Sequence, residues 1–279
     1  MHSMSHEYFA HNGKLLQIKQ AVIPVSSVEY AYGFGVYETI RVTRGVPFFL
    51  HDHLTRLMES AEIIGLEHIF TEEKIADTIA ALIEKNGVDT SNLKLLLIGA
   101  AVKEEAQLFI LCLNPLYPDK KLYREGATCV TYAYERAFPH AKTLNMLQSY
   151  LAYKKAKEAG CYDALLVDND GCITEGTRTN FFCIQGRTLI SPPEEKILLG
   201  VTRKAVLKVA KDNGFDYTER PITWGEMLKY DGAFVTSTSS KIIPVRSVDG
   251  EELPKSSHSL KELMDLYDRF LDSFEGPLH

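Results

Sequence analysis

The sequence predicts a mixed α/β protein built from two lobes, and three observations support this fold class. The chain has 279 residues, of which 45% are hydrophobic and 24% charged, so it can bury a substantial core. Strand-like runs alternate with segments of helical periodicity along the chain. Residues 115–121 hold two prolines and a charge cluster, which is typical of a linker. We therefore expect one domain over residues 1–117, a linker over 118–123 and a second domain over 124–279.

The first lobe opens with a predicted hairpin whose turn lies at residues 43–45. Asp52 follows and is placed to cap a helix. A second helix is expected to begin after Thr71 and to end at Gly87. The strands expected in this lobe cover residues 37–42, 46–50, 95–98 and 108–113.

The second lobe is expected to contain three helices. The first covers about 146–159 and ends at Gly160, the second follows Gly200, and the third opens with a capping box at Ser259. Residues 168–171 form a strong turn signal between two strands. The strands expected in this lobe cover residues 127–133, 164–167, 172–174, 180–184 and 233–235.

Composition excludes several classes of function. The net charge of −6 argues against nucleic acid as the main partner. The five cysteines are scattered without a CxxC pair, so we expect neither a metal site nor a disulfide framework. We find no apolar leader segment and no apolar run long enough to span a bilayer. These features predict a cytoplasmic protein that does not bind membranes.

Two residues suggest a reaction. Lys142 lies at a strand-to-helix transition, and Glu175 follows a strand-like segment and precedes Gly176. An aldehyde cofactor such as pyridoxal 5′-phosphate (PLP) needs an amine to hold it and a carboxylate to keep its ring nitrogen protonated. Taken alone, Lys142 is more simply a solvated lysine and Glu175 a loop carboxylate; their order in the chain favours the PLP interpretation.

The same cofactor needs a phosphate site. Gly200, Val201 and Thr202 open a helix, where free N–H groups attract anions. Residues 236–240 offer five hydroxyls in a row, among them Ser237 and Thr238, and Arg56 offers a charge. Each feature has a plainer interpretation: an ordinary helix cap, a polar turn and an exposed helix arginine.

Together these segments resemble the class IV, fold-type IV PLP transaminases, the group that holds D-amino acid and branched-chain aminotransferases and aminodeoxychorismate lyase. The resemblance covers nearly the whole chain, in order. It is carried by residues 32–38, 53–57, 142–145, 175–182, 197–203 and 234–238.

The resemblance implies a small N-terminal α/β domain, a larger C-terminal pseudo-barrel domain and a homodimer with shared active sites. It implies that Lys142 holds PLP and shuttles a proton, and that Glu175 binds the ring nitrogen. Tyr37 is implied to line the substrate pocket. The further residues implied in, or offered for, cofactor binding are Arg56, Leu198, Val201, Thr202, Ser237 and Thr238.

Within the family, residues 142–145, 160–164 and 234–240 look most like D-amino acid transaminases. Tyr37 also stands where branched-chain enzymes tend to have phenylalanine. The typical D-enzyme carries a carboxylate-binding arginine that residues 98–105 lack. Arg178 and Lys241 are the candidate replacements, with Lys103 a weaker third.

We therefore expect a ping-pong transfer of an amino group from a D-amino acid to a 2-oxo acid such as 2-oxoglutarate or pyruvate. Three alternatives remain open: an L-branched-chain aminotransferase, an aminodeoxychorismate lyase, and a binding protein that has lost catalysis.

Overall fold

The structure of the protein, a computed structural model, describes residues 6–115, 117–254 and 257–274. Among these, residues 6–115 and 141–146 form one unit, and residues 117–140 and 147–274 form the other. The short segment 141–146, which contains Lys142, thus belongs to the first unit although it lies far along the chain. The expected division placed this segment in the second domain.

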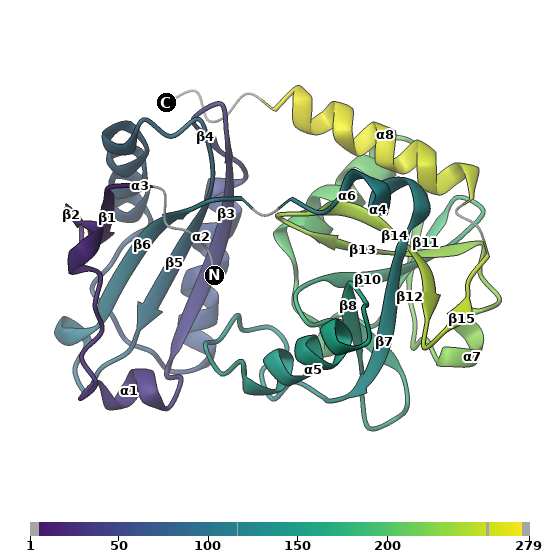
Figure 1. Cartoon of the computed structure of the whole chain (residues 1–279), viewed down its shortest axis with the longest axis horizontal. Coiled ribbons are helices and arrows are strands. Elements are labelled where there is room, and N and C mark those ends of the chain that lie inside the picture. Colours follow the sequence, from purple (N-terminus) through teal and green to yellow (C-terminus); the bar gives the residue numbers. More distant parts are fainter. Residues whose placement is uncertain (1–5, 116, 255–256, 275–279) are drawn as a thin grey trace. The chain divides into compact units, whose positions relative to one another are not determined.

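A six-stranded antiparallel sheet organises the first unit, in the order β2-β1-β6-β5-β3-β4 (Figure 1). Two helices pack on it, α2 (Leu50–Ile63) and α3 (Glu72–Asn86). The strands are β1 (Tyr8–His11), β2 (Lys14–Gln17), β3 (Gly35–Thr43), β4 (Val46–Pro47), β5 (Thr90–Ile98) and β6 (Gln107–Leu113). The short helices are η1 (Ile18–Gln20), α1 (Val28–Ala31) and η2 (Lys103–Glu105).

The side chains of strand β3 alternate between the two faces of the sheet. Val36, Ile40 and Val42 are buried in the same core as the apolar face of α2, whereas Tyr37 is only partly buried. Successive side chains of a strand point to opposite faces, so Tyr37 lies on the face away from α2. The hairpin expected here is confirmed, because β3 pairs with β4 in antiparallel register.

The helix ends of the first unit confirm one expectation and correct another. Thr71 caps α3 by accepting a hydrogen bond from the Lys74 amide, and Gly87 ends it with φ 59°. Helix α2, however, begins at Leu50 after Phe49, which has φ 54°, so Asp52 lies in its first turn rather than at its cap. The strand expected over residues 46–50 is correspondingly shortened to β4.

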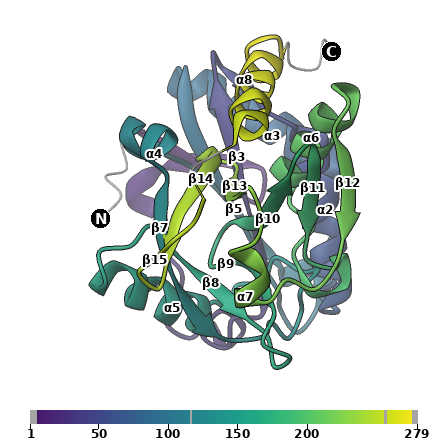
Figure 2. The same ribbon diagram turned by 90° about the vertical axis from the view of Figure 1, so that its right-hand side faces the viewer.

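The second unit is a barrel. Strands β10, β13, β14, β7, β8 and β9 pair in that order, and β9 pairs back with β10 through Glu175 and Asn180 (Figure 2). The strands are β7 (Ala127–Ala133), β8 (Asp163–Val167), β9 (Ile173–Gly176), β10 (Asn180–Gln185), β11 (Thr188–Ser191), β12 (Asp216–Glu219), β13 (Gly232–Ser237), β14 (Lys241–Val248) and β15 (Glu251–Glu252). The expected mixed α/β fold with a pseudo-barrel is confirmed.

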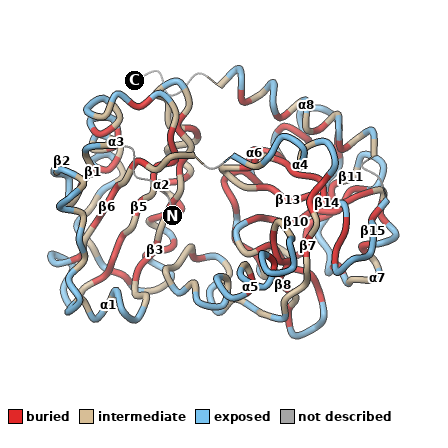
Figure 3. The backbone as a smooth tube through the Cα atoms, viewed as in Figure 1, coloured by how far each residue is buried: buried red, intermediate tan, exposed pale blue. Residues whose placement is uncertain are grey.

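Helices surround this barrel. They are α4 (Lys120–Glu125), α5 (Leu147–Glu158), η3 (Glu194–Lys196), α6 (Val201–Asp212), α7 (Trp224–Met227) and α8 (His258–Asp272). The barrel strands are largely buried, whereas α8 shows one exposed side (Figure 3). No helix within the described residues is both long and apolar enough to cross a membrane.

Two expectations for the second unit need correction, whereas the linker expected over 118–123 stays a prediction. Helix α4 begins within that segment. The cap of α8 is Ser257, whose hydroxyl accepts from the Leu260 amide, rather than Ser259. Glu175 lies within β9 instead of following it, because the strand continues to Gly176.

Candidate functional site

Lys142 lies on a segment that runs along the edge of β3. The Lys142 carbonyl accepts a hydrogen bond from the Tyr37 amide at 2.9 Å, and Thr143 bridges to Val36. The Lys142 amide donates to the Ser60 hydroxyl of α2 at 3.1 Å. The backbone of Lys142 is thus held by hydrogen bonds to both β3 and α2, so the point from which its long side chain extends is fixed.

The Tyr37 ring is the neighbour shared by two lysine amines. The Nζ atom of Lys142 lies 4.4 Å from the ring centroid, and the Nζ atom of Lys94 lies 3.5 Å from it. Tyr37 pairs with Leu96 across β3 and β5, so Lys94 reaches the ring diagonally from the same face of the sheet. The sequence-based interpretation included Tyr37 and Lys142 but missed Lys94.

Arg56 is held by a buried carboxylate on β3. Its Nε donates to Glu38 Oε1 at 2.7 Å, and its Nη2 donates to Glu38 Oε2 at 2.9 Å. His53 Nδ1 lies 2.7 Å from the same Oε2 atom. Burial by itself raises the pKa of Glu38, but the Arg56 guanidinium and the His53 ring outweigh it and hold this pKa well below its usual range.

The same cluster sets the state of His53. Burial lowers the pKa of His53, and the attraction of Glu38 opposes this shift only in part. A neutral imidazole beside an ionised carboxylate must carry its proton on Nδ1, because the carboxylate only accepts. Arg56 is therefore not the exposed arginine of the plainer interpretation: its guanidinium is buried and oriented.

In the second unit, Glu175 is buried in β9 with both carboxylate oxygens engaged. Arg136 Nη1 donates to Oε1 at 2.9 Å, and the Leu198 amide donates to Oε2 at 3.2 Å. The ion pair compensates the cost of burying this carboxylate. Arg136 was not expected at the site.

A polar row crosses the barrel beside Glu175. Glu175 faces Asn180 in the next strand, and Asn180 faces Thr236 in the strand after it. Directly paired residues share one face of a sheet. Asn180 donates to the Leu198 carbonyl at 2.7 Å, whereas the buried Thr236 hydroxyl has no hydrogen-bond partner among the described residues.

Helix α6 begins close to this row. Gly200 is its N-cap and provides no side-chain cap, and Val201 and Thr202 are its first two residues. A Cβ atom on Gly200 would collide with the Asn180 Oδ1 atom, so the close approach of the α6 N-terminus to Asn180 requires glycine. Uncapped amides and a threonine hydroxyl at this helix start fit an anion.

The hydroxyl-rich turn joins β13 to β14. The Ser237 hydroxyl lies 2.6 Å from the Ser240 hydroxyl and accepts from the Ser240 amide, so it stabilises the turn itself. Thr238 is partly buried next to it, and Leu198 is buried. The role of Ser237 in the turn follows from its neighbours in space, which spacing alone did not show.

The three cations offered for the substrate carboxylate all have other surroundings. The exposed Arg178 guanidinium carbon lies 4.4 Å from the Tyr153 ring centroid. Lys241 Nζ pairs with Asp268 at 2.6 Å. Lys103 is exposed on η2. Arg178 and Lys241 thus have partners within the protein, whereas Lys103 is exposed.

A buried aspartate holds the loop after Glu175. Asp163 Oδ2 accepts from Thr179 at 3.0 Å, and its Oδ1 accepts from the Thr177 hydroxyl and amide. Burial raises the pKa of Asp163, and these hydrogen bonds oppose the shift. Gly176 leaves room for this arrangement, because a Cβ there would collide with the Thr179 hydroxyl.

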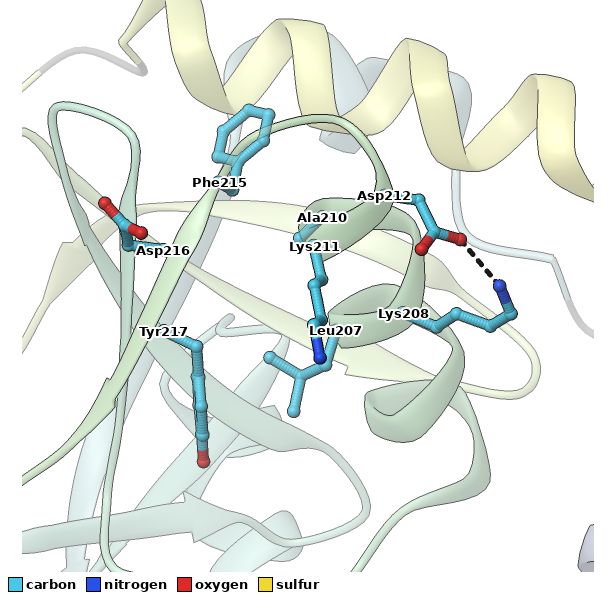
Figure 4. A pocket seen from close by; sticks show the side chains of 8 residues that line it. All are labelled: Leu207, Lys208, Ala210, Lys211, Asp212, Phe215, Asp216 and Tyr217. Carbon is cyan, nitrogen blue, oxygen red and sulfur yellow. Dashed lines mark hydrogen bonds and ion pairs between the residues drawn. The ribbon is translucent and has the colours of Figure 1, made fainter.

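A surface pocket of about 630 Å³ lies elsewhere in the second unit (Figure 4). Its lining comes from the second half of α6, which includes the charged pair Lys208–Asp212, and from Phe215 and the first two residues of β12. None of the predicted site residues lines it. We assign it no role in the reaction.

Comparison with known proteins then decides the family. The model of the amino-transferase class IV family matches residues 35–248. The chain belongs to the class IV aminotransferases. It is 30% identical over 254 residues to the D-alanine aminotransferase of Bacillus licheniformis, covering 87% of this chain and 88% of the relative. It is 32% identical over 252 residues to a putative branched-chain-amino-acid aminotransferase of Methanocaldococcus jannaschii, covering 86% and 87%.

Solved class IV structures agree. The branched-chain amino acid aminotransferase of Escherichia coli superposes with a TM-score of 0.88 at 25% identity, covering 96% of this chain and 95% of that one. The branched-chain aminotransferase of Thermoproteus uzoniensis, solved with norvaline, gives a TM-score of 0.86 at 27% identity, covering 95% of each chain. A further branched-chain amino acid aminotransferase of this fold was solved with pyridoxamine 5′-phosphate. The expected family and its cofactor, PLP, are thereby confirmed.

The side chains of this class IV aminotransferase fit PLP chemically. The second unit offers a buried carboxylate, an unpartnered buried hydroxyl at Thr236 and an uncapped helix start at Gly200, all within its described residues. The first unit offers the Lys142 amine on a rigid segment. A phosphate, a pyridinium nitrogen and an aldehyde need these kinds of group.

Proposed function

We propose that this class IV aminotransferase moves an amino group from a D-amino acid to a 2-oxo acid. The observation that carries the choice of D-substrates is Tyr37, which differs from the phenylalanine typical of branched-chain enzymes and lies beside the Lys142 amine. The D-alanine aminotransferase relative supports the same choice. The acceptor would be a small 2-oxo acid such as 2-oxoglutarate or pyruvate.

We assign the cofactor contacts as follows. The Lys142 Nζ atom is the attachment point, and it moves the proton that leaves the substrate Cα atom. The Glu175 carboxylate accepts the hydrogen bond of the ring nitrogen, with Arg136 and the Leu198 amide keeping it in place. PLP supplies the electron sink for the bond broken at Cα.

We assign the phosphate contacts to the following residues. Val201 and Thr202 provide the amides and the hydroxyl of the α6 start. Arg56, oriented by Glu38, provides the positive charge. Ser237 and Thr238 add hydroxyls of the turn, and Leu198 packs against the ring.

Two measurements test the cofactor assignment. Borohydride reduction of the coloured holoenzyme followed by peptide mapping should place the label on Lys142, and Lys142→Ala should bind PLP without becoming labelled. A label on any other lysine contradicts the assignment. Lys154→Ala, on the exposed side of α5, is the matched control and should label normally.

The substrate assignment is tested by pairing D- and L-alanine, glutamate and leucine with 2-oxoglutarate. D-donors should give at least tenfold higher kcat/KM than their L-enantiomers. The opposite preference would identify an L-branched-chain aminotransferase, which the Methanocaldococcus jannaschii relative favours as the second candidate. Pyruvate released from a chorismate-derived amine without an acceptor would indicate a lyase instead.

We also propose that the enzyme is a homodimer in which each subunit contributes to both active sites. Light scattering coupled to size-exclusion chromatography should give about twice the mass of the 31.4 kDa chain. A mass equal to one chain in an active preparation contradicts this proposal.

A further inference from the structure

The carboxylate of an amino acid substrate needs a cation, and the first unit contains one beside Tyr37. Lys94 Nζ lies 3.5 Å from the Tyr37 ring centroid, and Lys142 Nζ lies 4.4 Å from the same point. The two amines are therefore within about 8 Å of each other, the sum of these two distances. The carboxylate is bonded directly to the Cα atom of an amino acid. If Lys142 removes the proton from that Cα atom, the carboxylate therefore lies within the distance that separates the two amines.

Lys94 has no ion pair among the described residues, unlike Lys241 and Arg136. The charged or titratable groups that act on it are Tyr37, Lys142 and Glu38. Glu38 is already engaged by Arg56 and His53. Among the described residues, Lys94 thus has the Tyr37 ring as a partner but no carboxylate of its own, and a bound anion would supply one.

The surroundings of Lys94 make its charge costly. Its strand neighbours in register are Thr39 and Leu111, and neither provides a charge. Burial lowers the pKa of Lys94 to about 8, the attraction of Tyr37 and Glu38 opposing that shift and Lys142 adding to it. A partly buried lysine that has no carboxylate partner indicates a site for a ligand that carries a carboxylate.

We propose that Lys94 binds a carboxylate of the substrate, in the role of the arginine that residues 98–105 lack. This inference rests on the proposed transaminase function and names the group that recognises its substrates. A lysine presents a compact charge rather than a bidentate fork, so it tolerates carboxylates at slightly different positions. Broad acceptance of small amino acids follows.

Binding of unreactive carboxylates to the holoenzyme tests this without turnover. We would titrate propionate and glutarate into the wild type, Lys94→Met and Lys94→Arg, following the cofactor absorption and, independently, the heat of binding. Lys94→Met should weaken binding at least tenfold, and Lys94→Arg should keep it within about threefold. Lys85→Met is the matched control, because Lys85 Nζ also lies over a tyrosine ring, 4.9 Å from that of Tyr8, on an exposed face.

The two probes distinguish which carboxylate is bound. Equal weakening of propionate and glutarate assigns Lys94 to the α-carboxylate, whereas weakening of glutarate alone assigns it to a side-chain carboxylate. Unchanged binding of both probes by Lys94→Met, in a protein that unfolds at the wild-type temperature or above, overturns the inference. If probe binding depends on Lys94 but no amino donor reacts, the proposed function fails and the carboxylate site stands.

Discussion

At the scale of single residues, the chemistry of the first unit depends on side chains that compensate one another's charge. Glu38 has no exposed surface, and it binds the guanidinium of Arg56 and the ring of His53. Removing one partner of a buried ion pair leaves the other charge uncompensated. Glu38 is therefore a residue on which both the fold and the orientation of Arg56 depend.

Glu38→Gln should lower the free energy of unfolding by about 3–5 kcal/mol, the range measured when a buried pair is broken. Because the pKa of Glu38 is depressed in the folded protein, its stabilisation is complete above the unfolded-state pKa of about 4.3 and is lost as the pH falls. The difference between wild type and variant in urea unfolding should thus be full at pH 7 and shrink at acidic pH.

The control for this variant is Glu59→Gln, a change of an exposed residue on the same helix as Arg56. It should alter the unfolding free energy by less than about 0.5 kcal/mol. If the two variants unfold alike, the buried cluster does not stabilise the unit.

Removing the charge of Lys94 should change the unfolding free energy in the opposite direction, that is, it should stabilise the protein. Its pKa is about 8 in the folded protein and 10.5 for an ordinary lysine, so the unfolded chain binds the proton more tightly. The resulting cost is present in full below pH 8 and disappears as the pH rises towards 10.5. Lys94→Met should therefore stabilise the apoprotein by about 1–3 kcal/mol at pH 7 and by less at pH 10.

Thermal unfolding of the apoprotein at the two pH values measures this difference. Such a gain in stability on substitution is expected of a residue that is retained for function at a cost in stability. A loss of stability in Lys94→Met at pH 7 would show that Lys94 is held by contacts that favour its charge.

At the scale of elements, the loop between β9 and β10 is held from β8. Asp163 accepts hydrogen bonds from Thr177 and Thr179, which flank Arg178 and lie just after Glu175. Asp163→Ala leaves these donors without their acceptor in a buried place, and we expect a loss of about 1–3 kcal/mol in unfolding free energy. PLP should also bind more weakly, because the loop no longer fixes the end of β9.

Urea unfolding and PLP titration check this prediction, with Asp212→Ala as the control. Asp212 forms an exposed pair with Lys208, and such pairs contribute little. Asp163→Asn keeps the acceptor Oδ1 and should fall between the two. Equal effects of Asp163→Ala and Asp212→Ala would contradict the role given to Asp163.

At the scale of the whole molecule, the reactivity of the cysteine thiols reports on how well the cores of both units are packed. Cys112 is buried in the first unit, where burial raises its pKa to about 11. Burial also raises the pKa values of Cys129, Cys172 and Cys183 in the second unit. Cys161 is more accessible than these four.

The native protein should therefore show one fast-reacting thiol, Cys161, towards a thiol reagent at pH 8. The other four should react at least a hundredfold more slowly and become equivalent to Cys161 in denaturant. Peptide mapping after a short pulse identifies the modified residue. Fast modification of Cys112 or Cys183 in the native protein would contradict the cores described here.

The sequence by itself determined many of the elements and the family of this protein. Helix α3 begins and ends where Thr71 and Gly87 predict, since caps and periodicity act over a few residues. The spaced motifs around Lys142 and Glu175 likewise led to the class IV aminotransferases.

Only the tertiary structure decided which residues meet. Lys94 reaches Tyr37 through the register of β3 on β5, and Arg136, in the segment after β7, reaches Glu175 on β9. Periodicity tells which face of a strand a residue occupies, whereas its partners depend on pairing between distant segments. For this reason the carboxylate-binding candidates read from the sequence were Arg178 and Lys241, and Lys94 emerged only from the fold.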